Sequence, residues 1–247
     1  MGYFIGKLSD DPQYGREIDR LHQVGWPEFM LRDEKAALYW DLLMTVFADF
    51  QIVLCDDHKN VLAVGNSIPI FWDGTLEGLP SGWEGAFEKG AEGHKAGVEP
   101  NTLSALAIVI DPAYQGKGIS GKVIQAVKNA AIEKGFTHFI VPLRPSLKSR
   151  YPLIPMEKYI EWKNGEGLPF DPWLRTHYKA GGRIVKIAPE SMIIKGTIGE
   201  WEQWAEMKFP ESGNYVVAGA LTPVQIDCEN DLGTYIEPNV WIKHDLK

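Results

Sequence analysis

The chain has 247 residues, a net charge of −8 at pH 7 and 45% hydrophobic residues, which fits one large domain with a sizeable buried core. The acidic balance argues against nucleic acid as a partner, because phosphate backbones are bound by clustered Lys and Arg. Its two cysteines form no metal-binding spacing or disulfide framework, and no segment reads as a membrane span or a secretory signal, so we expect a cytoplasmic protein that binds neither metal nor membrane.

The first seventy residues predict two helices followed by a pair of strands. Residues 14–24 are amphipathic, and Asp33 is placed to cap a second helix over residues 34–48. Short apolar runs at 51–55 and 61–71 flank a polar turn and predict two paired strands.

Residues 73–100 form a long connection that is rich in glycine and charge. Trp83 and Phe87 lie one helical turn apart within it, which predicts a short helix. Connections of this length often act as lids over functional sites, and a tethered surface insertion is the alternative.

The stretch that follows predicts a strand, a glycine-rich loop and a helix. Leu103 to Ile110 is a near-continuous apolar run, which is typical of a strand buried on both faces. Asp111-Pro112 ends this strand, because proline has no amide hydrogen for a ladder. Glycines at 116, 118 and 121 then lead into a helix that ends near Lys134. Backbone amides and the positive end of the helix would converge on an anion, so we expect a phosphate-holding turn.

Two common nucleotide motifs fit this turn incompletely. Residues 116–121 match G-x-G-x-x-G, but five residues separate the strand from the first glycine, where a dinucleotide-binding turn needs it directly. Arg144 after the next strand could meet a 2′-phosphate, so this alternative stays open. Residues 116–122 match most of a Walker A loop, but Val123 stands where a hydroxyl must reach magnesium.

A third pattern uses every residue of the turn. Gln115-Gly-Lys-Gly118-Ile-Ser120 matches Q/R-x-x-G-x-G/A, with Ser replacing the last small residue, and the wider stretch 108–118 resembles the acyl-CoA signature of the GNAT N-acetyltransferase superfamily. The resemblance implies that the loop amides hold the pyrophosphate of coenzyme A and that the preceding strand bonds its pantetheine arm. The coenzyme-binding residues that it implies are Ile108, Val109, Ile110, Gln115, Gly116, Lys117, Gly118, Ile119, Ser120 and Gly121.

A second match to the same family lies about sixty residues further on. Asp171-Pro172 is a strong helix start, and the helix contains Tyr178-Lys-Ala-Gly-Gly182, which resembles the family's Y-x-x-x-G pattern. The resemblance implies that Tyr178 meets the coenzyme sulfur and protonates the leaving thiolate. Arg183 stands where the family usually has Phe, which leaves the start of the next strand in doubt.

The segment between the two matches predicts a strand and a basic loop. Residues 137–141 read as a strand parallel to the central one, and Pro142 and Pro145 should stop its pairing there. Such a strand suits a fold in which coenzyme A enters between two splayed strands. We expect the basic loop, with Arg144, Lys148 and Arg150, to hold an acidic acceptor or the 3′-phosphate of coenzyme A, and Trp72 and Trp83 to form an aromatic pocket for the acceptor.

The last part predicts a strand at 183–194, a helix that starts with the capping box Thr197–Glu200, and a final long strand at 215–226. We therefore expect an α/β (α+β) protein of GNAT fold, with a mixed sheet splayed between its two middle parallel strands and helices on both faces. Residues 1–247 would form one domain with a core over 14–226, an inserted segment before the central strand, an extra helix between the last two strands and a C-terminal extension over 227–247.

The resemblance implies an N-acyltransferase that uses acetyl-CoA or another acyl-CoA as co-substrate. The amine of a small molecule would attack the thioester directly in a ternary complex, with a backbone amide near Val109 or Ile110 holding the oxyanion. Glu99 is the candidate base, and a homodimer is left open. The alternatives are a non-catalytic acyl-CoA sensor on the same fold, because no base is obvious, and a nucleotide-binding α/β protein.

Overall fold

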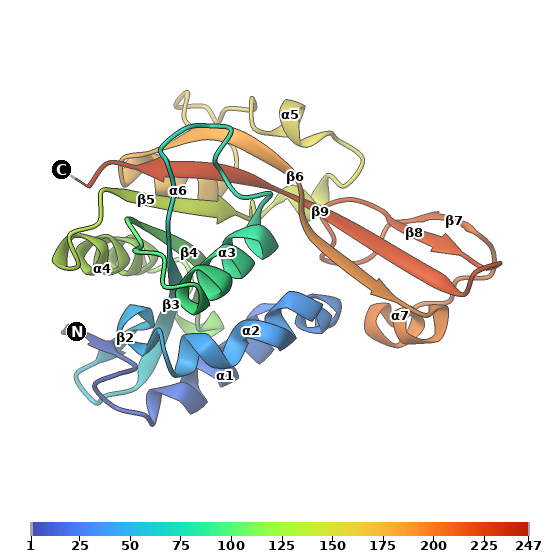
Figure 1. The fold of residues 1–247 in the computed structure, drawn as a ribbon. Helices are drawn as coiled ribbons and strands as arrows, with labels where there is room; N and C mark the ends of the chain where they lie inside the picture. Colours follow the sequence, from blue (N-terminus) through green and yellow to red (C-terminus); the bar gives the residue numbers. More distant parts are fainter. Residues whose placement is uncertain (1, 247) are drawn as a thin grey trace.

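The computed structural model describes residues 2–246, which form a twisted mixed sheet with helices on both faces (Figure 1). The strands of this part of the chain are β1 (Tyr3–Lys7), β2 (Ile52–Asp56), β3 (Val61–Ile70), β4 (Thr102–Ile110), β5 (His138–Leu143), β6 (Gly182–Gly196), β7 (Gly213–Tyr215), β8 (Val224–Asp227) and β9 (Leu232–His244). The helices are α1 (Tyr14–Gly25), α2 (Glu34–Met44), α3 (Trp83–Lys95), α4 (Ser120–Glu133), α5 (Met156–Tyr159), α6 (Pro172–Lys179) and α7 (Ile198–Ala205), with short 3₁₀ turns η1 (Glu28–Arg32), η2 (Ala48–Phe50), η3 (Pro112–Tyr114) and η4 (Lys148–Arg150).

The strand order is β1-β2-β3-β4-β5-β9-β8-β7, and β6 pairs with the other edge of β9. The pairing of β4 with β5 is parallel and joins only residues 102–104 to residues 138–140. Beyond that point the two strands separate, while the other edge of β5 stays paired with β9 from Phe139 through Leu143. The expected splay between the middle parallel strands is therefore present.

The helices divide between the two faces of the sheet. Helices α1 and α3 pack on β3 and β4, and α2 packs on α3. Helix α4 covers the opposite face across β2 to β5, and α6 packs against α4 and β6. Gly65 of β3 has α4 directly beneath it, since a Cβ there would come within 2.9 Å of Val123 and Val127. The predicted α/β class with helices on both faces is thus confirmed.

A bulge interrupts the pairing of the two central antiparallel strands. Asn66 of β3 lies opposite Ala107 of β4 and Ser67 opposite Ala105, so Leu106 is an extra residue without a partner on β3. Bulges of this kind bend a strand and re-aim its side chains, and they are frequent beside functional sites.

Four sequence-based expectations about the elements are wrong. The helix expected over 34–48 ends at Met44, and Pro142 does not stop β5, because it is paired with Trp241 of β9. Residues 215–226 do not form the last long strand, since Gly219 has a φ of +85° and separates β7 from β8. The segment 227–247, expected as an extension, carries β9, which joins β5, β6 and β8 in the sheet.

Strands β6 and β9 continue beyond the main sheet as a long ribbon that carries α7, β7 and β8, seen on the right in Figure 1. The capping box of Thr197 and Glu200 starts α7 as predicted. Trp201 of α7 is fully buried against Phe29 of η1 and Tyr235 of β9, and its indole donates to the Gly233 carbonyl at 3.0 Å. Gly233 leaves room for this indole ring, which a Cβ at that position would contact. An apolar cluster separate from the main core therefore joins the ribbon to η1.

Between residues 2 and 246, no helix is both long and apolar enough to cross a membrane.

Candidate active site

A cavity of about 470 Å³ lies where β4 and β5 separate. Its walls come from α1, α2, η1, the first turn of α3, and the splayed parts of β4 and β5. Large apolar side chains dominate the lining: Trp26, Met30, Leu31, Trp40, Trp83, Leu106, Trp173 and Met192. Cavities with an apolar lining and a few polar groups are the usual sites for small ligands and substrates.

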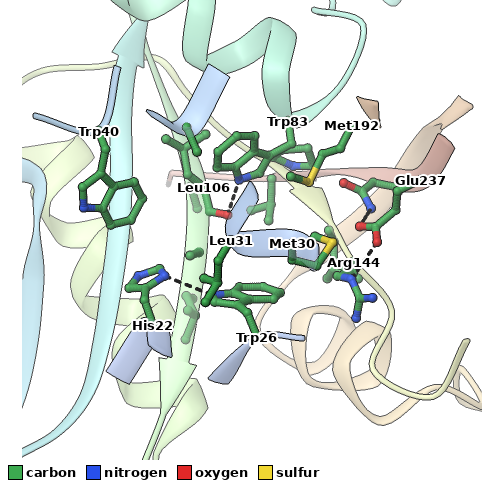
Figure 2. Close-up of a pocket in the computed structure, with 18 of the residues that line it drawn as sticks. His22, Trp26, Met30, Leu31, Trp40, Trp83, Leu106, Arg144, Met192 and Glu237 are labelled. Atoms are coloured by element: carbon green, nitrogen blue, oxygen red, sulfur yellow. Dashed lines mark hydrogen bonds and ion pairs between the residues drawn. The ribbon is translucent and has the colours of Figure 1, made fainter. Parts of the chain in front are cut away.

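Helix α1 contributes His22, which is held as a neutral imidazole. His22 Nδ1 accepts a hydrogen bond from the Trp26 indole at 3.0 Å (Figure 2). Nε2 therefore carries the proton, and it lies 2.8 Å from Asn66 Oδ1. Burial lowers the pKa of His22, which favours the same neutral form. Asp19, one turn earlier on α1, is exposed at the cavity and lies in no ion pair with any described residue.

The opposite wall carries Arg144 from the end of β5 and Glu237 from β9. Arg144 Nε donates to Glu237 Oε2 at 2.9 Å (Figure 2). Arg144 Nη2 donates to the Gly219 carbonyl at 2.5 Å. Glu237 is fully buried and also accepts bonds from Tyr235 Oη at 2.7 Å and Asn239 Nδ2 at 2.9 Å. The two charges neutralise each other at the wall, as buried charges require.

Trp83 lies at the start of α3 and reaches across to β4. Its indole donates to the carbonyl of Leu106 at 2.8 Å, and its backbone amide donates to Ser191 Oγ at 2.7 Å. Helix α3 is the helix expected within residues 73–100, so this inserted segment forms one wall of the cavity.

The glycine-rich turn lies at the end of β4 and opens α4. Gly116 and Gly118 have φ values of +74° and +73°, a region that glycine adopts without strain. Cβ atoms added at 116, 118 or 121 would meet nothing within 4 Å, so the turn is open to a ligand. Lys117 is exposed beside it, and the first amides of α4 have no earlier turn to bond to. This geometry suits an anion such as a diphosphate.

Tyr178 lies near the end of α6, the helix that packs on α4. Its side chain is 43% exposed, and its ring faces the guanidinium of Arg183 at 4.6 Å. Tyr178 is not part of the cavity lining, whereas Trp173 at the start of the same helix is. Neighbouring His177 is fully buried and bonds His244 of β9 at 2.9 Å, which makes it a structural residue.

The other expected site residues divide into two groups. Ile108, Arg144 and Trp83 line the cavity. Glu99 is exposed in the loop before β4, Arg150 is exposed in η4, and neither reaches the cavity lining. Trp72 is buried under Lys243 and His138, with its indole donating to the Thr75 carbonyl at 2.8 Å.

Lys148 is a correction to the expected basic binding loop. Its side chain is fully buried and its ammonium donates to the carbonyls of Tyr151 at 2.9 Å and Leu221 at 2.6 Å. Burial lowers the pKa of Lys148 to about 8. The residue therefore ties two loops together and does not face a ligand.

Sequence reasoning missed the residues that α1 and β9 bring to the cavity. His22, Trp26 and Asp19 lie on one side of an amphipathic helix, and their spacing of three to four residues was visible in the sequence. Glu237 and Asn239 flank a proline in a segment expected to lie outside the core. Only the strand pairing shows that they face the site.

The comparisons with known proteins agree with this architecture. No family model matches the chain. A curated protein described as arginine N-acetyltransferase avaD from Aspergillus versicolor is 34% identical over 276 aligned positions, which cover 99% of this chain and 94% of the relative. The chain belongs to the GNAT superfamily of N-acetyltransferases.

Two solved structures share the fold of this GNAT protein. The loading GNATL domain of CurA from Lyngbya majuscula matches with a TM-score of 0.61 and 18% identity, over 100% of this chain and 98% of that one. A GphF GNAT-like decarboxylase, solved in complex with isobutyryl-CoA, matches with a TM-score of 0.58 and 18% identity over 100% of both chains. The expected GNAT fold is therefore confirmed.

Metal binding finds no support in the described residues. Within 2–246, no group of three or more His, Cys, Asp or Glu side chains is placed to hold a metal ion.

Proposed function

We propose that this GNAT protein transfers an acetyl or other short acyl group from acyl-CoA to an amine of a small cationic molecule of the arginine type. The cavity between the separated parts of β4 and β5 carries this proposal, since it lies where the thioester and the acceptor must meet. The full-length relationship to a protein described as an arginine N-acetyltransferase supports the acceptor class.

The charges around the cavity also support a cationic acceptor. Arg144 and Glu237 offset each other, and His22 is neutral, so Asp19 leaves the cavity with a net negative charge. Tryptophan faces attract planar guanidinium groups, and Trp26 and Trp40 line the same cavity as Asp19. The chain itself is acidic, which favours the approach of a cation.

The coenzyme would lie with its diphosphate on the amides of the turn at 116–121 and its acyl end between β4 and β5. Supporting this placement are the open turn and the unpaired inner edge of β4 beyond Ser104. Tyr178 is proposed to protonate the thiolate from the α6 side, on the strength of its motif position and of the packing of α6 on α4. The absence of paired cysteines fits a reducing compartment such as the cytoplasm, with Cys55 buried and Cys228 exposed.

The decisive test is transfer to arginine against its neutral analogue citrulline. With acetyl-CoA, we expect thiol release and an acetylated product with arginine, and about three- to tenfold lower kcat/KM with citrulline, because its ureido group carries no charge for Asp19. Equal rates with both would contradict the cationic acceptor but leave the transferase intact.

A non-catalytic acyl-CoA sensor remains the second candidate. Two cavity groups that could take a proton from an amine are already hydrogen-bonded: both nitrogens of His22 and both oxygens of Glu237 have partners. This favours a protein that binds acyl-CoA without catalysing transfer. Calorimetry that shows coenzyme A binding, together with no thiol release from a panel of amines, would establish the sensor.

A further inference from the structure

The bulge leaves Leu106 of β4 without a strand partner on either side. On the β3 side, Leu106 is the extra residue between Ala105 and Ala107, and on the β5 side pairing ends at Ser104. Residues 105–108 line the cavity. Unpaired peptide groups in a strand are free to rotate unless another group holds them.

Trp83 holds this peptide from the opposite wall. Its indole Nε1 donates to the Leu106 carbonyl at 2.8 Å, from the first residue of α3 (Figure 2). Because a peptide group is planar, fixing the Leu106 carbonyl also fixes the direction of the amide of Ala107 and restricts the peptide that follows. The indole is therefore a clamp on the part of β4 that faces the cavity.

The clamp is itself anchored on two further strands. The amide of Trp83 donates to Ser191 Oγ of β6 at 2.7 Å, and that hydroxyl donates to Asn239 Oδ1 of β9 at 2.6 Å. Ser191 and Asn239 are at most 1% exposed. Asn239 Nδ2 in turn donates to Glu237, the partner of Arg144. A chain of hydrogen bonds, buried between Ser191 and Glu237, thus runs from the β4 bulge to the far wall of the cavity.

We propose that Trp83 is a positioning residue of the transfer reaction, which holds the Leu106 peptide so that the amides after it are aimed at the thioester oxygen. The inference rests on the proposed acyltransfer. Preorganised backbone donors stabilise an oxyanion because they need no reorientation when the charge develops. Losing the clamp lets the strand relax, and small misplacements of reacting groups are costly to rate.

The first experiment separates turnover from binding. Trp83→Phe keeps an aromatic ring but removes the donor, and we expect kcat to fall about tenfold while KM for acyl-CoA and for the acceptor changes less than about twofold. Trp83→His retains a ring N–H and should recover part of the loss. The matched variant is Trp40→Phe, in the same cavity, whose indole donates to no described residue; it should change the acceptor KM more than kcat.

The second experiment measures the clamp without any activity. Deuterium uptake of peptides that cover residues 102–110 should rise in Trp83→Phe and in Ser191→Ala, but not in Trp40→Phe. Unchanged uptake, or a Trp83→Phe defect confined to KM, would overturn the positioning role. A wild-type protein that transfers no acyl group to any amine would refute the proposed function instead, and the uptake data would still decide whether Trp83 holds the bulge.

Discussion

At the level of single residues, Arg144 and Glu237 show why the cavity wall can carry charge. Glu237 is fully buried, and a lone carboxylate there would be costly, but Arg144, Tyr235 and Asn239 all donate to it. Burial, and then the nearby Glu237 carboxylate, raise the pKa of Tyr235, so this phenol stays a donor. The Arg144–Glu237 pair therefore adds no net charge to the cavity. The sign of the net charge in the cavity is set by residues at its edge.

Asp19 is the residue that we expect to give the cavity its net negative charge. Asp19→Asn should raise KM for arginine about three- to tenfold with little change in kcat, because one exposed charge contributes on the order of 1 kcal/mol. Steady-state kinetics at two salt concentrations check this, since screening should shrink the difference. The control is Glu17→Gln on the same helix. Glu17 forms an ion pair with Arg20, and its substitution should leave KM for arginine unchanged.

Tyr178 is expected to act at the coenzyme end. Tyr178→Phe should lower kcat with acetyl-CoA by about a hundredfold or more, within the range of a lost general acid, while the affinity for coenzyme A stays within about twofold. Stopped-flow detection of thiol release and calorimetry measure the two quantities. Unchanged turnover would remove Tyr178 from the mechanism and leave the thiolate to solvent.

At the level of elements, the first turn of α3 is fastened to α2 as well as to β4. The carboxyls of Asp33, which caps α2, and Glu84 on α3 lie together, and Glu84 also accepts a bond from the Ile193 amide of β6. Burial first, and then the neighbouring Asp33 carboxylate, raise the pKa of Glu84 to about 7. Burial raises the pKa of Asp33 as well.

This arrangement predicts a stability that depends on pH. The ordinary pKa of Glu84 is 4.5, so between pH 4.5 and about 7 the folded protein binds a proton that the unfolded chain has lost. Stability should therefore fall as pH rises through that window. Glu84→Gln should flatten the profile and raise the melting temperature at pH 7.5 by about 2–4 °C for each kcal/mol recovered. Calorimetric melts at a series of pH values measure the effect, and Glu88→Gln, one turn further on α3, is the control. A pH–stability profile for Glu84→Gln that runs parallel to that of the wild type would contradict the assignment.

At the level of the whole molecule, the central strand–turn–helix unit could be predicted because its signals are local. Short stretches of neighbouring residues determine each part of this unit: the apolar run of β4, the proline that ends it and the glycines with positive φ. The cap of α6 at Asp171 and the capping box of α7 are equally local, and both are present.

The C-terminal strands could not be predicted, because long-range packing overrides their local pattern. Residues 215–226 are rich in apolar residues, but Gly219 turns the chain there. Strand β9 contains Glu237-Pro238-Asn239, which reads as a turn, yet Arg144 and Ser191 from two other strands satisfy its buried polar groups. The acceptor side of the site could not be predicted for the same reason, because it forms only when α1, β5 and β9 pack together.

The tryptophans that line the cavity also give the protein an intrinsic fluorescence signal for ligand binding. Four of its nine indoles, those of Trp26, Trp40, Trp83 and Trp173, border the cavity, while Trp72, Trp201 and Trp241 are deeply buried elsewhere. A bound molecule would displace water from the first group and leave the second unchanged. Titrating the protein with candidate amines should therefore shift its ultraviolet emission to shorter wavelength, which would allow label-free screening before any product can be detected.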